Sequence, residues 1–148
     1  MSKNLLIIDD EELIVKNLSM ILEDLADKIF TARDGQEGIN VLLQNKENIH
    51  CIICDINMPR MNGVDVIKKA RKEKINIPFI FYTAHGNHEL MMEAVKYGAF
   101  DFIDKPNMEG LEEIISRGLS EGFELKNKRE KNPEEYISEY QKILKKIK

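Results

Sequence analysis

Five polar side chains directly follow short apolar segments that lie far apart in the chain. Asp9 and Asp10 follow the first such segment, Asp55 the third, Thr83 the fourth and Lys105 the fifth. Carboxylates that gather in one place repel one another unless a proton or a cation relieves them. Mg²⁺ meets this need because it is a hard cation that binds oxygen atoms of a few carboxylates and water. These residue types therefore predict a magnesium site with a hydroxyl and an ammonium group beside it, if the fold brings them together.

The intervening sequence predicts a fold that does so. Short apolar segments alternate with stretches in which apolar residues recur at helical spacing, which is typical of βαβ units and a parallel sheet. We expect a doubly wound, flavodoxin-like α/β fold with five strands in the order 2-1-3-4-5 and five flanking helices. In such a sheet the site lies beyond the carboxyl ends of the strands. The expected strands are 5–8, 29–32, 51–54, 79–82 and 102–103, and the expected helices are 12–25, one opening at Asp34-Gly35, one after Gly63, one from an Asn87 N-cap through Tyr97 to Gly98, and about 108–123.

Composition indicates a soluble globular protein. Of 148 residues, 43% are apolar and 32% are charged, and the net charge is -4. Residues 124–148 carry eight basic and five acidic residues, so residues 1–123 have a net charge of -7. An acidic body with a mildly basic tail gives no case for direct nucleic acid binding. The apolar runs near the N-terminus are too short for a signal peptide or a membrane span, so we expect a cytoplasmic protein without membrane contact.

The C-terminal segment reads as a separate unit. We expect residues 1–123 to form one domain and residues 124–148 to form a charged linker followed by an amphipathic helix. Asn132 and Pro133 suit the N-cap and first position of that helix. Such a helix is too short to be stable alone. The apolar residues of this helix recur at helical spacing and are Ile137, Tyr140, Leu144 and Ile147. The segment could be a linker to an output domain, a dimerising helix or a lid packed on the first domain, and these three alternatives stay open.

Two cysteines and two histidines suggest other chemistry only weakly. Cys51 and Cys54 have the C-x-x-C spacing of redox sites, but residues three apart in a strand face opposite sides of a sheet. Buried thiols are therefore the better interpretation. His50 and His88 have no ligand pattern around them, and we expect both at the surface.

Four short motifs, in order, carry a resemblance to a known family. The segment Asp55-Ile-Asn57-Met-Pro-Arg-Met-Asn-Gly63 resembles the phosphoacceptor segment of two-component response-regulator receiver domains, of the chemotaxis-regulator type. Asp9-Asp10, Thr83-Ala84 and Lys105-Pro106 match the other signature positions of that family. The resemblance covers about residues 3–123 and leaves the tail unexplained.

The resemblance implies a role for each site residue. Asp55 would attack a phosphohistidine on a histidine kinase or phosphotransfer protein, and would ligate Mg²⁺ together with Asp10. Asn57 would add its backbone carbonyl to the metal, and Asp9 would bind it through water. Thr83 and Lys105 would hold the phosphoryl oxygens, and the Lys105–Pro106 peptide would be cis. An ionised carboxylate needs no activating base, and phosphoryl transfer mainly requires positioning and charge neutralisation.

The same resemblance implies how a signal leaves the site. Thr83 would move toward the new phosphoryl group, and Phe102 would swing into the vacated space. The output face would then consist of the 87–97 helix, the fifth strand and the last helix, where Met91 and Met92 lie. His85 would shape the access of water. We expect no enzyme beyond self-phosphorylation from a phosphodonor and autodephosphorylation.

Three other functions compete with this interpretation. Phosphohydrolases with an aspartyl nucleophile need a second aspartate two residues later, where this chain has Asn57. A flavin module needs a phosphate-binding loop after the first strand, where 9–12 is wholly acidic and would repel phosphate. A degenerate receiver, acting as a phosphorylation-independent interaction module, remains the alternative, although every expected residue is present.

Overall fold

A computed structural model describes residues 2–84, 88–105, 110–127 and 133–147. Strands and helices alternate from the N-terminus, as the sequence predicts, and a sixth helix follows. The strands are β1 (Asn4–Ile8), β2 (Lys28–Ala32), β3 (Cys51–Cys54), β4 (Phe79–Thr83) and β5 (Asp101–Asp104). The helices are α1 (Glu12–Leu22), α2 (Gly35–Asn45), α3 (Gly63–Lys72), α4 (His88–Lys96), α5 (Leu111–Asn127) and α6 (Pro133–Ile147).

The five strands form one parallel sheet in the order β2-β1-β3-β4-β5, which confirms the predicted topology. All residues of β1, β3 and β4 are buried, whereas β2 and β5 at the two edges are partly exposed. Strands covered on both faces read as continuous apolar runs, which explains why these segments stand out in the sequence.

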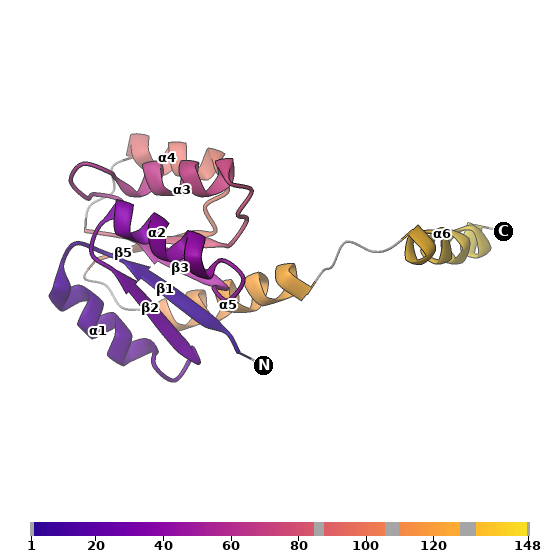
Figure 1. Ribbon diagram of the computed structural model, residues 1–148, viewed down its shortest axis with the longest axis horizontal. Helices are drawn as coiled ribbons and strands as arrows, with labels where there is room; N and C mark the ends of the chain where they lie inside the picture. The colour runs from indigo at the N-terminus through magenta and orange to yellow at the C-terminus, as the bar shows by residue number, and fades with distance from the viewer. Residues whose placement is uncertain (1, 85–87, 106–109, 128–132, 148) are drawn as a thin grey trace.

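Helices cover both faces of the sheet (Figure 1), and each face has its own core. One core joins the sheet to α2, α3 and α4, and the other joins it to α1 and α5. Cys54 lies in the first core and Cys51 in the second, both fully buried and unbonded to each other. The prediction of two buried thiols on opposite faces is confirmed, and it excludes a C-x-x-C redox pair.

Polar side chains define where α2 and α3 begin, at the edge of the sheet where the site lies. The Asp34 carboxylate accepts a hydrogen bond from the Glu37 backbone N–H at 2.8 Å, as an N-cap does. Asn62 and Asp65 form a reciprocal capping box at the start of α3, with distances of 2.9 and 3.0 Å. The caps stabilise these first turns by satisfying backbone donors that a helix leaves unpaired.

The last helix of the α/β body departs from the prediction. The sequence suggested a helix over about 108–123 and a linker from 124, whereas α5 runs from Leu111 to Asn127. Its C-terminal turns pack on the loop before β3: Gly122 lies against the His50 backbone, and the Phe123 ring lies 5.7 Å from the His50 ring. Lys126 also donates to the Lys46 carbonyl. These contacts explain why the helix continues over residues 124–127, which the sequence had assigned to a charged linker.

Two smaller predictions also need correction. The first helix ends at Leu22, three residues earlier than expected, and a turn continues to Leu25. His50 is buried rather than at the surface, because Gly122 and Phe123 of α5 pack against it, and its Nδ1 accepts a hydrogen bond from the Asn4 backbone N–H at 3.0 Å. The N-caps predicted at Asn87 and Asn132 lie outside the described residues.

The tail forms a helix, as predicted, and α6 begins at Pro133. It lies apart from the α/β body (Figure 1), and its described apolar side chains are exposed. Within the residues that the structure describes, no helix combines the length and the apolar composition needed to cross a membrane.

Candidate phosphoacceptor site

The parallel sheet gathers the predicted site residues at one edge. Asp9 and Asp55 directly follow the paired ends of β1 and β3, and the Asp55 backbone N–H donates to the Ile8 carbonyl at 2.9 Å. Thr83 ends β4, and Lys105 follows β5 with its backbone N–H 2.5 Å from the Thr83 carbonyl. Because the strands run in the same direction, their carboxyl ends meet at this edge.

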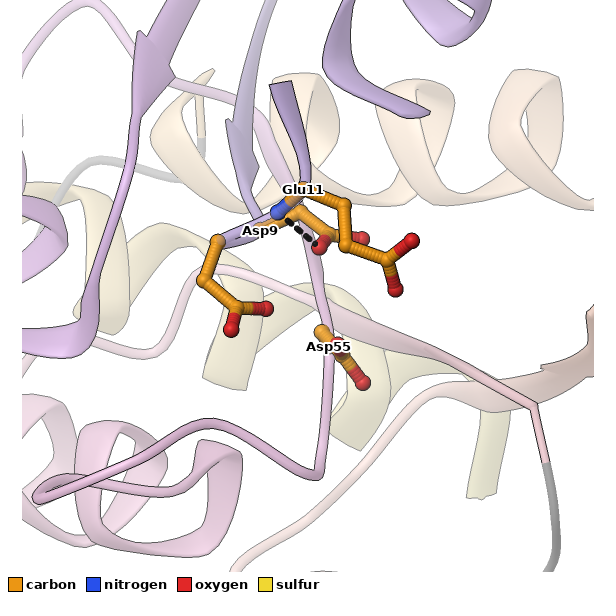
Figure 2. A group of neighbouring side chains, drawn as sticks. Asp9, Glu11 and Asp55 are labelled. Atoms are coloured by element: carbon orange, nitrogen blue, oxygen red, sulfur yellow. Dashed lines mark hydrogen bonds between the residues drawn. The ribbon is translucent and has the colours of Figure 1, made fainter. Parts of the chain in front are cut away.

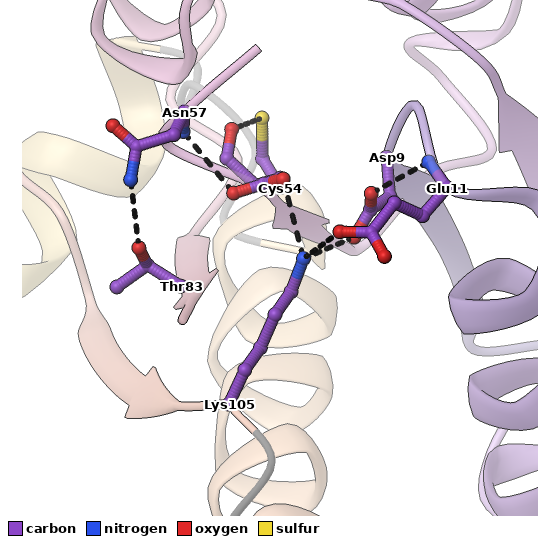
Figure 3. A network of polar contacts seen from close by, with 7 residues as sticks. Asp9, Glu11, Cys54, Asn57, Thr83 and Lys105 are labelled. Atoms are coloured by element: carbon purple, nitrogen blue, oxygen red, sulfur yellow. Dashed lines mark hydrogen bonds and ion pairs between the residues drawn. The ribbon is translucent and has the colours of Figure 1, made fainter. Parts of the chain in front are cut away.

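Lys105 is the centre of the buried part of the site. Its Nζ lies 2.8 Å from an Asp9 carboxylate oxygen and 3.2 Å from one of Asp55 (Figure 3). Glu11 lies farther away, at 3.7 Å, and is mostly exposed. Lys105, Asp9 and Asp55 are each more than nine-tenths buried. Buried charges persist only when they are paired and hydrogen-bonded, so the three side chains hold one another in place.

The two buried carboxyl groups bind protons more strongly than free aspartates. Burial raises the pKa of Asp9 to about 6, against the opposing effects of Lys105 and of the Glu11 backbone N–H. Burial likewise raises the pKa of Asp55, although Lys105 and the Asn57 backbone N–H favour its ionised form. Burial acts to lower the pKa of Lys105, but the two aspartates outweigh it, and the pKa rises. One ammonium group therefore does not fully offset the cost of burying the two carboxylates.

Four carboxylates fit the cation that the sequence predicts. Asp9, Asp10, Glu11 and Asp55 each offer an oxygen atom, and these atoms all lie within 4.8 Å of one another. Figure 2 shows Asp9, Glu11 and Asp55 converging on one region. An all-oxygen donor set of this charge suits Mg²⁺, and a nearby dication would favour the ionised form of Asp55.

Asn57 connects the acceptor to the threonine. Its backbone N–H donates to an Asp55 carboxylate oxygen at 3.1 Å, and its side-chain Nδ2 donates to Thr83 Oγ1 at 3.1 Å (Figure 3). Gly63 closes the same loop, with its backbone N–H 3.0 Å from the Ile56 carbonyl. A Cβ at Gly63 would lie 2.6 Å from the Asp55 carbonyl oxygen, so only glycine allows this approach.

Phe102 lies on β5, and β4 separates it from β3, which Asp55 follows. Its ring stacks on the buried Phe81 ring, with centroids 5.8 Å apart. It is half-buried and lines a cavity of about 350 Å³ together with Met91, Met92 and Val95 of α4. The structure therefore brings this predicted switch residue to the predicted output face.

Sequence reasoning missed two contributions. Glu11 joins the carboxylate cluster, and its place directly after Asp9-Asp10 was the available signal. The Asn57 side chain contacts Thr83, whereas only its backbone carbonyl was assigned a role, and no spacing rule predicts a contact between residues 26 apart. His85 and the Lys105–Pro106 peptide lie outside the described residues.

Comparison with known proteins gives the family. The response regulator receiver domain family matches residues 5–116. The chain belongs to this family. The receiver is 36% identical over 103 residues to the response regulator SaeR of Staphylococcus aureus, which covers 70% of this chain and 44% of SaeR. The chain thus spans less than half the length of this curated relative.

Solved structures agree with the receiver fold. A receiver domain protein from Clostridium thermocellum matches with a TM-score of 0.73 and 28% identity, covering 84% of this chain and 96% of that one. CheY in a CheX–CheY–BeF₃–Mg²⁺ complex from Borrelia burgdorferi matches with a TM-score of 0.69 and 30% identity, covering 79% and 87%.

Proposed function

We propose that this receiver accepts a phosphoryl group on Asp55 from a phosphohistidine of a histidine kinase or phosphotransfer protein. The supporting observation is the buried pair of Asp55 and Lys105, with an oxygen-lined acidic cluster on the open side. The cluster offers a nucleophile, a fixed positive charge and a place for a dication within one small region.

The transfer needs no proton from the protein. An Asp55 carboxylate oxygen attacks phosphorus, the new P–O bond forms, and the P–N bond of the donor breaks with its electron pair returning to the imidazole. Charge then develops on the phosphoryl oxygens, which the Lys105 ammonium beside Asp55 would hold and toward which the Thr83 hydroxyl would turn. In this proposal Lys105 shifts its contact from the Asp55 carboxylate to the phosphoryl group.

Mg²⁺ is the proposed cofactor. Asp10 and Asp55 would hold it through carboxylates, Asn57 through its carbonyl and Asp9 through water, and Glu11 stands beside them. When bound, the metal neutralises phosphoryl charge and orients the group. The presence of Mg²⁺ and BeF₃ with CheY in the Borrelia complex supports this assignment.

The output proposal follows from Thr83 and Phe102. Phosphorylation adds a charge of about -1.5 to -2 and new acceptor oxygens. Thr83 would turn toward these oxygens. Phe102 would then leave the cavity that it lines together with α4 and enter the space behind Thr83. A downstream protein or domain would read the change on α4, β5 and α5. We assign no turnover chemistry beyond self-phosphorylation and autodephosphorylation.

Intact-mass measurement after incubation with acetyl phosphate and Mg²⁺ tests the acceptor. We expect one added phosphoryl group on the wild type and none on Asp55→Asn. Asp65→Asn serves as the matched control, because Asp65 is an exposed aspartate at the start of α3, and it should be modified like the wild type. No modification of the wild type would instead favour the phosphorylation-independent interaction module.

A further inference from the structure

The helix α6 exposes an apolar face that the receiver function does not use. Ile137, Tyr140, Ile143 and Leu144 are all exposed, between 42% and 62%, although they recur at the spacing of one helix face. A helix of 15 residues is marginal in water unless it packs on something. A partner surface must therefore cover this face.

The charges of α6 indicate what that surface is. Its three glutamates all lie in the first half, and its three lysines all lie in the second half. Two such helices side by side in parallel would place like charges together, whereas an antiparallel pair places each acidic half beside a basic half. We propose that α6 pairs with α6 of a second copy of this chain, in antiparallel orientation.

The apolar and charged positions agree on one register. In an antiparallel pair centred near Tyr140, Ile137 is level with Leu144 of the second copy. In the same register Glu134 lies two residues, or about 3 Å along the helix axis, from the level of Lys145 of the second copy, at the margin of the apolar face. Both sets of contacts occur twice by symmetry, as a two-fold interface requires.

Two other occupants fit the sequence of α6 less well. A helix that lies on a membrane surface carries Lys and Arg along its polar face, whereas the first half of α6 is acidic. The cavity between α4 and β5 is lined in part by His88 and Lys96, which provide no negative charge to pair with the lysine half of α6. Of these three occupants, a second α6 is the one that satisfies both halves of the helix.

Sedimentation equilibrium of the full chain tests the pairing. We expect an average mass that rises with concentration toward twice 17.2 kDa. Tyr140→Asp, on the apolar face, should weaken dimerisation at least tenfold. Ser138→Asp adds the same side chain on the opposite face and should leave it unchanged. A wild type that stays monomeric, or equal loss in both variants, would overturn the proposal.

Cysteine cross-linking tests the orientation. The native thiols are fully buried, so single exposed cysteines can be followed. A mixture of Ile137→Cys and Leu144→Cys chains should form disulfide-linked heterodimers under a mild oxidant faster than either variant alone. Faster linking of Ile137→Cys to itself would show parallel helices and refute the antiparallel pair. The pairing does not depend on phosphorylation, so Asp55→Asn should dimerise like the wild type.

Discussion

The Asn57 side-chain amide donates a hydrogen bond to the Thr83 hydroxyl, with Nδ2 and Oγ1 3.1 Å apart. Thr83 is fully buried, and the same Asn57 contacts the Asp55 carboxylate through its backbone N–H. In the proposed activation, Thr83 turns toward the phosphoryl group and must leave this amide. Asn57 would therefore stabilise the unphosphorylated arrangement and act as a positioning residue for the switch.

A double-mutant cycle measures this contact. We expect Asn57→Ala and Thr83→Val to show a coupling of about 1 kcal/mol in the free energy of unfolding without phosphodonor, which is typical of one neutral hydrogen bond. Urea unfolding of the four proteins gives the value. The Thr83 side chain has further interactions, which the cycle cancels. Additive effects would show that the contact does not couple the two residues.

Replacing Lys105 should separate metal binding from signalling. Its ammonium lies 2.8 Å from Asp9 and 3.2 Å from Asp55, so it competes with a cation for the same carboxylates. We expect Lys105→Ala to bind Mg²⁺ more tightly, on the order of tenfold, because a nearby positive charge is removed. Calorimetric titration measures this affinity, with Lys16→Ala on the exposed side of α1 as control.

Lys105→Ala should also lose the conformational response to phosphorylation, because the phosphoryl group on Asp55 then has no ammonium group to contact. Equal loss of Mg²⁺ binding and of the response would contradict the role assigned to Lys105.

Movement of Phe102 can be followed through neighbouring methionines. Its ring lines one groove with Met91 and Met92, so its departure would change the ring-current shifts of their methyl groups. We expect methyl NMR signals of both to move when phosphodonor and Mg²⁺ are added. The Met20 methyl group, exposed on α1, should not move. Unchanged Met91 and Met92 signals in a protein shown to be phosphorylated would refute the swing of Phe102.

His50 should make stability depend on pH. Burial lowers its pKa, aided by the charges of Lys126 and Lys3 and opposed by Asp27. The unfolded chain then binds the proton more readily than the folded one. The contribution of His50 to the free energy of unfolding is therefore fully present above its unfolded-state pKa of about 6.5, and it declines as the pH falls below that value.

Urea unfolding at several pH values between 5 and 8 measures this effect against His50→Asn, whose side-chain oxygen can still accept from Asn4. The wild type should lose stability relative to this variant as the pH falls. The comparison cancels Asp9, whose raised pKa acts in the opposite direction. If the free energies of unfolding of the wild type and of His50→Asn changed equally with pH, the lowered pKa of His50 would be contradicted.

The cysteines should be inert in the folded protein. Burial raises the pKa of Cys51 to about 12, and burial raises that of Cys54 as well. The thiolate is the reactive form, so iodoacetamide at neutral pH should modify neither thiol until the protein unfolds. Mass spectrometry with and without urea measures the modification. Rapid labelling of the native protein would show that these strands open.

The sequence alone predicted the sheet, its order and most of the site. Apolar runs of buried parallel strands are distinctive, and each predicted acid, hydroxyl and ammonium follows such a run, so the topology implies their meeting at one edge. Motif order then indicated the family. Local patterns of this kind need no knowledge of long-range packing.

Tertiary structure decided the contacts that join distant segments. The Asn57–Thr83 hydrogen bond, the extension of α5 to Asn127 and the burial of His50 each depend on packing between elements. Charged residues at 124–127 look like a linker until Gly122 and Phe123 meet the loop before β3. Which carboxylates Lys105 binds is likewise a matter of distances across the sheet, because spacing along a chain does not specify them.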